Sequence, residues 1–452
     1  MKSIVTGPSR KSGKQIRESG ENTTMRMKPQ SIAVRMAVML LLIAPFAHAA
    51  DWPQYRGPNQ DGISTETLNP VWPAEGPKLL WKIPVNGYGS FAISGDKVFA
   101  LTSRDNKGEM RELCVALDAA TGKELWAADI TIGKYASAAD ADDEKSGDGP
   151  GSTPTVSDGK VYVYSTDAKL CCFDAQTGKE LWRVDVVKDH GGAGRVPKWG
   201  NSSSPVVDGD VVFVAGGGPG QSVLAIKKDS GQVVWKTEDE PSDFNTPVVT
   251  TMHGQRQVIF CLGHKLVGIS VKDGKTLWRK GVAWEEAAYS SSQSQPIVYE
   301  DKVCYSASGC ALFQIVKWDG GFYGKWLWDI NYHAGYSTPV LWDGHFYGTI
   351  GTEKNNSFTC FDFATGGRRG SRFKWGQKQF GCKASVILVG DKLVVLSDVG
   401  DVVVAEPKPD AYKEITRFKA IAGRCWSTPA FSNGRLYVRS SKEGACYEMS
   451  AK

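Results

Sequence analysis

A chain of 452 residues with 50 glycines and 15 tryptophans is rich in turns and large aromatic side chains, and few stretches show the helical periodicity of a helical bundle. Residues 1–50 carry eight Lys/Arg and two Asp/Glu, which leaves 46 basic and 47 acidic side chains in residues 51–452. This near-neutral balance gives no broad positive surface, so the sequence predicts no nucleic-acid partner.

The first predicted element is an export signal within residues 1–50. A charged segment with Lys28 and Arg35 precedes the apolar stretch AVMLLLIAPFA, and a small-x-small cleavage site ends at Ala49. The apolar stretch is too short to span a membrane as a helix. We therefore expect cleavage near Ala49, a periplasmic or secreted protein, and no membrane span after cleavage. A buried core helix is the alternative, and the polar residues 1–24 leave open a mis-assigned start codon.

A hairpin unit that ends in tryptophan recurs along the rest of the chain. A small residue opens each copy, a Gly-containing turn follows because Gly accepts positive φ, and the closing Trp offers a large apolar surface for packing between sheets. One copy is degenerate, with Asp319-Gly320-Gly321 leading to Trp328. The other copies are ALDAATGKELW (116–126), CFDAQTGKELW (172–182), AIKKDSGQVVW (225–235), GISVKDGKTLW (268–278) and a stretched CFDFATGG followed by FKW (360–375).

A second repeated signal lies upstream of each hairpin and supplies two further strands. It reads Ser/Thr-Pro, two or three apolar residues, a turn and another strand, as in STPTVSDGKVYVY and STPVLWDGHFYG. Proline is tolerated at the opening of a strand because it need not donate into the ladder. Eight copies occur, counting weaker ones near Phe91 and Ile387.

Together the two signals predict an all-β protein, an eight-bladed β-propeller of four-stranded antiparallel blades in one domain, residues 51–452. The last copy ends near Met449 after three strands, and PKLLWKIPV (77–85) supplies the missing strand, which closes the ring and removes open edges. An open solenoid or sandwich leaves this strand unexplained. The predicted structural anchors are Trp81, Trp126, Trp182, Trp235, Trp278, Trp328 and Trp375.

The pattern A-x-D-x-x-T-G-K-x-x-W resembles the tryptophan-docking repeat of quinoprotein dehydrogenases. It also resembles the propeller lipoprotein of the outer-membrane β-barrel assembly machinery. The segment DWPQYRGPNQDGIS (51–64) is similar to the mature start of many exported quinoprotein-like propellers. The resemblance covers roughly residues 51–450 and specifies a fold, but one fold hosts many activities.

The connections between blades are expected to converge on one face, called the funnel face. In quinoprotein enzymes the funnel holds pyrroloquinoline quinone (PQQ) with calcium, and the resemblance implies an Asn and a Glu as metal ligands, an Asp as base and an Arg on the quinone. Carboxylates are few here (Asp243, Glu285 and Glu286), although calcium prefers several oxygens including carboxylates. The predicted binding residues of the funnel are Tyr88, Ser152, Asn201, Asn245, Gln293, Tyr336, Lys383 and Trp426.

Cysteine spacing gives no metal or haem motif, since neither C-x-x-C nor C-x-x-C-H occurs. Cys171-Cys172 lies inside a strand, where neighbours point to opposite faces, so we interpret these residues as small core side chains rather than a vicinal disulfide. Two pairings stay open as disulfides: Cys304 with Cys310, and Cys382 with Cys425.

We also expect two long insertions, residues 140–151 and 191–201, to lie on the funnel face. The first is acidic but lacks the register of an EF-hand calcium loop, and the second is Gly-rich but joins no strand to a helix as a phosphate loop would. Long loops on a rigid scaffold commonly carry binding.

The sequence thus favours an exported, non-catalytic monomer that binds another exported or envelope protein, or a glycan, through the funnel face. No catalytic residue, metal or cofactor is predicted on this reading. The alternative is a PQQ- and calcium-dependent oxidoreductase that acts on an alcohol or sugar.

Overall fold

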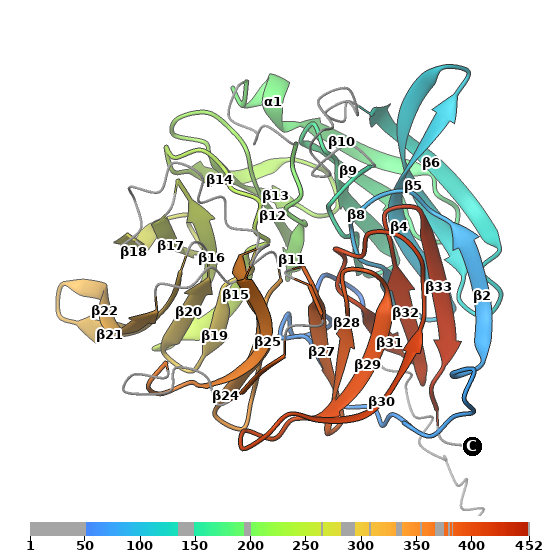
Figure 1. Cartoon of the computed structure of the whole chain (residues 1–452). Coiled ribbons are helices and arrows are strands. Elements are labelled where there is room, and N and C mark those ends of the chain that lie inside the picture. The colour runs from blue at the N-terminus through green and yellow to red at the C-terminus, as the bar shows by residue number, and fades with distance from the viewer. Residues whose placement is uncertain are drawn as a thin grey trace, which may run out of the picture. The chain divides into compact units, whose positions relative to one another are not determined.

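The protein, represented by a computed structural model, is described for residues 51–133, 149–193, 200–263, 265–281, 294–306, 309–330, 337–352, 355–366, 375–377, 380–381 and 383–450. These residues lie within one compact unit, Ala49–Lys452. Eight separate sheets form an eight-bladed propeller (Figure 1), which confirms the predicted fold class. Over the described ranges, the single helix is α1 (Val186–Asp189), and no helix there has the length and apolarity to cross a membrane.

The strands follow one another blade by blade in chain order. Blade 1 contains β3 (Ala92–Ser94), β4 (Lys97–Asn106), β5 (Glu109–Asp118) and β6 (Glu124–Ile132), and blade 2 contains β7 (Thr155–Ser157), β8 (Lys160–Tyr164), β9 (Lys169–Asp174) and β10 (Glu180–Asp185). Blade 3 contains β11 (Val206–Asp208), β12 (Val211–Ala215), β13 (Val223–Lys227) and β14 (Val233–Thr237), and blade 4 contains β15 (Val248–Met252), β16 (Gln255–Leu262), β17 (Lys265–Ser270) and β18 (Thr276–Gly281).

The second half of the ring repeats the order. Blade 5 contains β19 (Ile297–Tyr299), β20 (Lys302–Ser306), β21 (Cys310–Trp318) and β22 (Gly321–Ile330), and blade 6 contains β23 (Val340–Trp342), β24 (His345–Thr352), β25 (Asn355–Asp362) and β26 (Trp375–Gln377). Blade 7 contains β27 (Ser385–Val389), β28 (Lys392–Leu396), β29 (Asp401–Glu406) and β30 (Lys413–Lys419), and blade 8 contains β31 (Ala430–Ser432), β32 (Arg435–Arg439) and β33 (Glu443–Glu448).

The ring closes as the sequence predicts. The N-terminal strand β2 (Leu79–Pro84) pairs antiparallel with β33, with Trp81 opposite Cys446, and becomes the outer strand of blade 8. Figure 1 shows this blue strand beside the red strand β33. Chain ends from opposite termini therefore complete one blade, and unfolding one end exposes the edge of the other.

Each outer-strand tryptophan of the regular blades binds the hairpin turn of the next blade. The indole Nε1 of Trp126 donates to the carbonyl oxygen of Ala175 at 3.2 Å, and the ring lies over Gly178. Gly178 has φ +73°, and a Cβ there would stand 2.7 Å from the indole, so turn geometry and docking both require glycine. The same pair of contacts joins Trp81 to Ala119 and Gly122, Trp182 to Lys228 and Gly231, Trp235 to Val271 and Gly274, and Trp328 to Phe363 and Gly366.

The burial of these tryptophans is not uniform. Trp81, Trp182, Trp278 and Trp328 are buried, whereas Trp126 and Trp235 are half-buried. The side chain of Trp375 lies outside the described residues. The contribution of these anchors to stability stays a prediction.

Trp278 of blade 4 is the exception to the docking pattern. Its Nε1 donates to Oε1 of Gln257 in its own blade at 2.7 Å rather than to a carbonyl of blade 5. The indole covers Gly268, where a Cβ would lie 2.3 Å away. The Gly-containing turn that receives the indole in other blades is replaced in blade 5 by a two-residue turn between the longer strands β21 and β22, and Trp278 folds back onto its own sheet.

The Ser/Thr-Pro signal has a second role that the sequence did not reveal. The backbone N–H of Ser90 in blade 1 donates to Oγ1 of Thr153 in blade 2 at 2.9 Å, and Thr153 N–H donates to Oγ of Ser204 in blade 3 at 2.9 Å. Equivalent bonds join blades 3 to 4, 5 to 6 and 8 to 1. The Ser or Thr hydroxyl at this position thus links neighbouring inner strands at five of the blade interfaces. At blade 5 this position is Gln295, which has no hydroxyl.

The segment before β2 lies among the inner strands, where the blue trace of Figure 1 runs through the centre. Trp52 bridges to Ile93 of blade 1, and Pro53 accepts a bond from Val156 of blade 2. β1 (Ile63–Ser64) then adds in parallel to β27 as a fifth strand of blade 7. This axial segment, residues 51–66, therefore ties several blades together from inside the ring.

Two side chains of the axial segment reach the remaining inner strands. The buried Arg56 donates from Nη1 and Nη2 to the carbonyl oxygens of Thr338 and Pro339 in blade 6, at 2.8 and 2.9 Å. Gln60 donates from Nε2 to the Pro247 carbonyl of blade 4 at 3.0 Å. Burial lowers the pKa of Arg56, because desolvation disfavours its charge.

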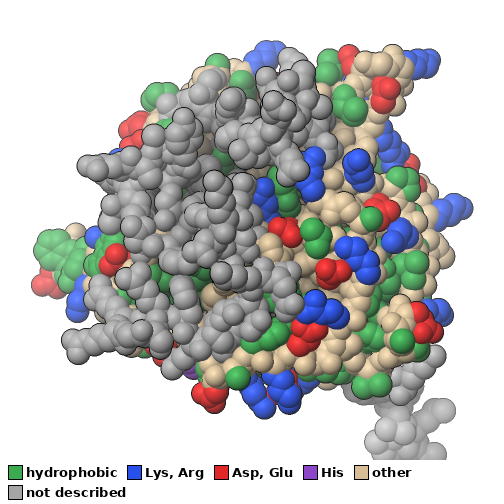
Figure 2. Space-filling model, viewed as in Figure 1, with side chains coloured by type: hydrophobic (Ala, Val, Ile, Leu, Met, Phe, Trp, Pro, Cys, Tyr) green, Lys and Arg blue, Asp and Glu red, His purple; other side chains and the backbone are tan. Residues whose placement is uncertain are grey.

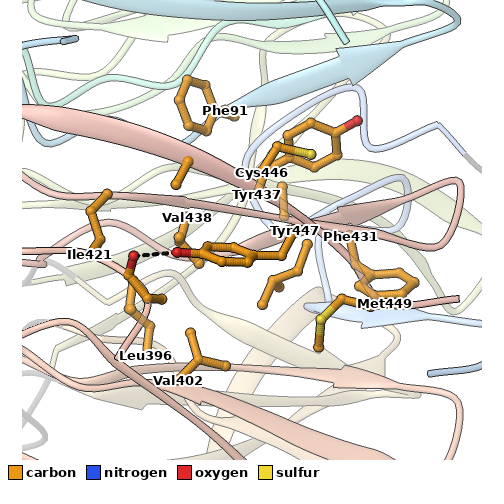
Figure 3. Packing of buried hydrophobic residues seen from close by; sticks show 14 of the residues in the cluster. Phe91, Leu396, Val402, Ile421, Phe431, Tyr437, Val438, Cys446, Tyr447 and Met449 are labelled. Carbon is orange, nitrogen blue, oxygen red and sulfur yellow. Dashed lines mark hydrogen bonds between the residues drawn. The ribbon is translucent and has the colours of Figure 1, made fainter. Parts of the chain in front are cut away.

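The largest hydrophobic cluster joins blades 7, 8 and 1 at the closure. Figure 3 shows Phe431, Tyr437, Val438 and Tyr447 of blade 8 among Leu396 and Val402 of blade 7, with Phe91 of blade 1 above. The Tyr447 hydroxyl donates to the Ala420 carbonyl, so its polar atom is satisfied within this core. The region where the two chain ends meet is thus built as a packed core.

Candidate functional site

Three of the predicted funnel residues come together between blades 7, 8 and 1. Tyr88 precedes blade 1, Lys383 precedes blade 7 and Trp426 precedes blade 8. The Tyr88 and Trp426 rings are stacked with their centroids 4.8 Å apart and an interplanar angle of 20°. Lys383 Nζ lies 3.6 Å from the centroid of the Trp426 ring. Connections that are about 340 residues apart in the chain thus form one cluster.

Arg424 adds a second cation to this group. Its guanidinium carbon lies 5.5 Å from the Trp426 ring centroid. Cations over the faces of aromatic rings are attracted by the ring quadrupole, most strongly to Trp. We call Tyr88, Lys383, Arg424 and Trp426 the aromatic–cation cluster. Tyr88, Arg424 and Trp426 are half-buried and Lys383 is buried, so three of the four residues are partly exposed to solvent.

A carboxyl group lies next to the aromatic–cation cluster. Burial raises the pKa of Asp398, and the positive charge of the nearby Lys383 partly opposes that rise. The cluster therefore combines two positive side chains, two aromatic rings and one partly desolvated carboxyl group. Such a mixture suits recognition through aromatic surface and charge.

The other predicted funnel residues have different surroundings. Asn201 is buried, donates from Nδ2 to the carbonyl oxygens of Ser165 and Ser203 at 3.2 and 3.1 Å, and accepts from Ser203 N–H at 3.0 Å. Asn245 is also buried and bonds both backbone groups of Cys261 at 3.4 to 3.5 Å. Ser152 is fully buried. Gln293 and Tyr336 lie outside the described residues.

The donor set for PQQ with calcium can be compared with these residues. The amides of Asn201 and Asn245 already bond the backbone, so they are not presented as metal ligands. Within the described ranges, no three His, Cys, Asp or Glu side chains gather in a group that could hold a metal ion. Among the described residues, Asn201 and Asn245 thus do not fit as calcium ligands, and Glu285, Glu286 and Gln293 lie outside the described residues.

The Cys171-Cys172 pair has no bearing on a quinone site. Cys171 packs in the core between blades 1 and 2, whereas Cys172 packs with Trp182 in the core between blades 2 and 3. Both are free thiols, and burial raises the pKa of each to about 12. The two side chains point to opposite faces of β9, as alternation along a strand requires.

The described surface around the closure carries both signs of charge. Figure 2 shows Lys/Arg and Asp/Glu side chains interspersed on the right of the view, without one large patch of a single sign. Ion pairs such as Arg104–Glu124 and Lys82–Glu443 account for part of this alternation. The aromatic–cation cluster is therefore a local feature rather than part of a wide basic surface.

Sequence reasoning missed Arg424 and the axial segment. Arg424 stands two residues before Trp426 in the same connection, and that spacing was the available signal. The opening of the axial segment carries a family resemblance, but its contacts with inner strands of distant blades depend on tertiary neighbours that local sequence does not specify. Of the second predicted pairing, Cys382 with Cys425, Cys382 lies outside the described residues.

Comparison with known proteins agrees with this architecture. Residues 109–369 match the protein-family model described as outer membrane protein assembly factor BamB. The chain therefore belongs to this family of PQQ-type repeat propellers. BamB of Bordetella pertussis is 24% identical over 338 residues, which cover 73% of this chain and 76% of that protein.

Quinone-dependent dehydrogenases are similar over shorter stretches. The dehydrogenase subunit of the quinone alcohol dehydrogenase of Gluconobacter oxydans is 25% identical over 269 residues, 56% of this chain and 31% of that protein. The corresponding subunit of Komagataeibacter europaeus is 31% identical over 137 residues, 29% of this chain and 18% of that protein. The chain thus spans less than a third of the length of these relatives.

Solved structures share the fold at low identity. The crystal structure of BamB from Moraxella catarrhalis gives a TM-score of 0.57 at 14% identity and covers 83% of this chain and 100% of that chain. Quinohemoprotein alcohol dehydrogenase ADHIIG from Pseudomonas putida gives 0.61 at 13% identity and covers 89% and 81%. Both likenesses concern the propeller fold.

Proposed function

We propose that this protein is an exported, non-catalytic propeller that binds another envelope protein through its funnel face. The aromatic–cation cluster is the observation that carries the proposal. Trp, Tyr and Arg are the side chains that contribute most often to the energetic centres of protein interfaces. Here they stand half-exposed on connections between rigid blades. The axial segment and the closure core hold these connections in place, which lowers the ordering cost of binding.

The export part of this proposal rests on the sequence of residues 1–50 and on the family. A charged segment, a short apolar stretch and a small-x-small site are typical of a cleaved signal. The name of the matched family refers to assembly at the outer membrane. We infer a periplasmic or secreted location for the mature chain, and a protein rather than a nucleic acid as its partner; a glycan is the other ligand class that an aromatic surface could take.

Site-specific photo-crosslinking in the native host tests the binding face. A photoreactive amino acid at Ala422, an exposed position two residues before Arg424, samples the cluster without altering it. The matched control is Ala120, an exposed alanine in the hairpin turn of blade 1. We expect one discrete protein adduct from position 422 and none from position 120. Equal crosslinking at both positions, no adduct at 422, or an adduct that is a glycan would contradict a protein partner at this face.

A quinone-dependent oxidoreductase is the second candidate, favoured by the sequence similarity to alcohol dehydrogenase subunits. Titration of the purified protein with PQQ and calcium, followed by absorbance and dye-linked alcohol oxidation, distinguishes the two functions. We expect neither a bound quinone spectrum nor turnover. A stoichiometric spectrum with turnover would replace the proposed binding function.

A further inference from the structure

Blade 5 contains a pair of cysteines whose sulfur atoms are in contact. Cys304 lies on β20 and Cys310 opens β21, and their Sγ atoms are 3.4 Å apart. In the ladder, Cys304 stands opposite Leu312 and Cys310 opposite Ser306, so the two thiols meet across the hairpin. A disulfide has an S–S bond of about 2.05 Å, so closing the pair needs a movement of about 1.4 Å.

The environment of the pair is apolar and offers no competing partner. Both side chains are buried, at 3% and 1% exposed, in the core between blades 5 and 6 with Trp328, Phe346 and Phe361. Across the described part of the chain, no other two cysteines have sulfur atoms in contact at hydrogen-bonding distance. Cys114 and Cys171 share a core but make no such contact, and Cys261 instead bonds the Tyr305 hydroxyl.

We propose that Cys304 and Cys310 are a redox pair that forms an intrachain disulfide across β20 and β21 when the chain folds in the presence of a disulfide oxidant. One thiolate attacks the external disulfide and releases one thiol, and the second cysteine then displaces the other. Two protein thiols are oxidised, one external disulfide is reduced to two thiols, and the protons pass to those products. The proposed export would place the chain where such oxidants exist, but the pair itself is independent of the binding function.

Because Cys304 and Cys310 are buried in the folded protein, we infer that their redox state is fixed during folding. The pKa of Cys304 lies well above its ordinary value because burial disfavours the thiolate, which is the reacting species. Because Cys304 and Cys310 are only 3% and 1% exposed, we expect oxidants and reductants to react with them slowly once the core between blades 5 and 6 has closed. The folded protein therefore keeps whichever state it acquired before this core closed.

The pair lies in a blade whose contacts with the preceding blade depart from the repeat. Blade 5 lacks both the turn that receives the preceding tryptophan and the Ser/Thr hydroxyl that receives the preceding inner strand, and Gln295 Nε2 donates instead to the Pro247 carbonyl oxygen of blade 4 at 3.3 Å. A covalent bond between the two central strands would add a link within blade 5 itself.

Refolding under two conditions tests the proposal. The mature chain is unfolded with reductant and refolded either with excess glutathione disulfide or with reduced glutathione, then alkylated under denaturing conditions and mapped by mass spectrometry. We expect a linked peptide containing both cysteines, two hydrogens lighter than the reduced form, only after oxidative refolding. Folded reduced protein exposed to the same glutathione disulfide should stay fully alkylatable at both positions.

Cysteine variants and the melting temperature provide two further tests of the disulfide. Cys304→Ser and Cys310→Ser should each abolish the linked peptide, whereas Cys114→Ala, a buried single cysteine, should leave it unchanged. The oxidised form should melt a few degrees above the reduced form, and this difference should vanish in Cys304→Ser. Full alkylation of Cys304 and Cys310 after oxidative refolding would overturn the proposal, as would a disulfide that joins other cysteines instead. Rapid oxidation of the folded, reduced protein would show that folding does not fix the redox state.

Discussion

The interface between blades 1 and 2 and the interface between blades 4 and 5 use different chemistry for the same task. Between blades 1 and 2, Trp126 binds the turn at Gly178 and Ser90 donates to the Thr153 hydroxyl, which are the two links of the repeat. Between blades 4 and 5 both links are missing, since Trp278 bonds Gln257 in its own blade and Gln295 offers no hydroxyl.

Individual contacts replace the repeated links at the interface between blades 4 and 5. His253 Nε2 lies 2.6 Å from the Ile315 carbonyl oxygen, and Cys261 Sγ lies 2.6 Å from the Tyr305 hydroxyl. Lys280 Nζ stands 5.4 Å from the Trp326 ring centroid. Each repeated link needs a group from both blades. Where blade 5 lacks its group, different contacts join it to blade 4.

Gly268 shows this coupling within one sequence. Blades 1, 2, 3, 6 and 8 carry Ala or Cys at this position, and blade 4 carries Gly because the folded-back indole of Trp278 occupies the space of a Cβ. Glycine in place of Ala or Cys at position 268 therefore reflects the altered contact of Trp278 on the neighbouring strand.

The largest expected effect comes from removing the closure of the ring. Deleting residues 51–86 removes β2 and the axial segment, bares the edge of β33 and opens the largest core. We expect loss of cooperative unfolding, measured by circular dichroism during heating. Deleting only residues 51–76 keeps β2 and should leave a cooperative but destabilised domain. A 51–86 deletion that melts cooperatively near the intact midpoint would contradict closure by β2.

The next effect concerns a regular anchor. Trp182→Ala removes a buried indole and its bond to Lys228, and truncating a buried Trp typically costs about 3–5 kcal/mol. That is a large share of the roughly 5–15 kcal/mol of a typical domain. Chemical denaturation should show the loss in the unfolding midpoint. A decrease in unfolding free energy below about 1 kcal/mol would show that the docking contact of Trp182 contributes little to stability.

A smaller effect tests the irregular interface. Gly268→Ala places a methyl group against the Trp278 indole, and overpacking of this kind typically costs up to about 3 kcal/mol. Combining it with Trp278→Leu should recover part of that loss, because the clash is removed, and the non-additivity appears in a double-mutant cycle of unfolding free energies. Strict additivity would show that Gly268 is required for another reason.

The smallest effect concerns the inner hydroxyl links. Thr153→Val keeps the shape of the side chain and removes the acceptor for Ser90 N–H, which should cost about 1 kcal/mol. Thr153→Ser retains the hydroxyl and should stay close to the native unfolding free energy. Equal stability of Thr153→Val and Thr153→Ser would show that the hydrogen bond contributes nothing measurable.

The sequence predicts the blades well because each repeat encodes its own turn, strand period and anchor. It also predicts closure, since Trp81 stands without a preceding hairpin. The site is predicted less completely. Tyr88, Lys383 and Trp426 are identified by their place in the connections, but the backbone bonds of Asn201 and Asn245 depend on tertiary neighbours that local sequence does not specify. The same holds for the contacts of Arg56 with blade 6.

The tryptophans that dock between blades and Trp426, which we propose binds a partner, should respond differently to truncation. The direct measurement is Trp426→Ala in the protein with the photoreactive residue at 422, scored for thermal midpoint and for adduct formation. We expect a midpoint within about 1 °C of the parent, which is less than about 1 kcal/mol for a domain of about 400 residues, together with loss of the adduct. A fall in midpoint as large as that of Trp182→Ala, or an undiminished adduct, would show that Trp426 is part of the core and not of a binding site.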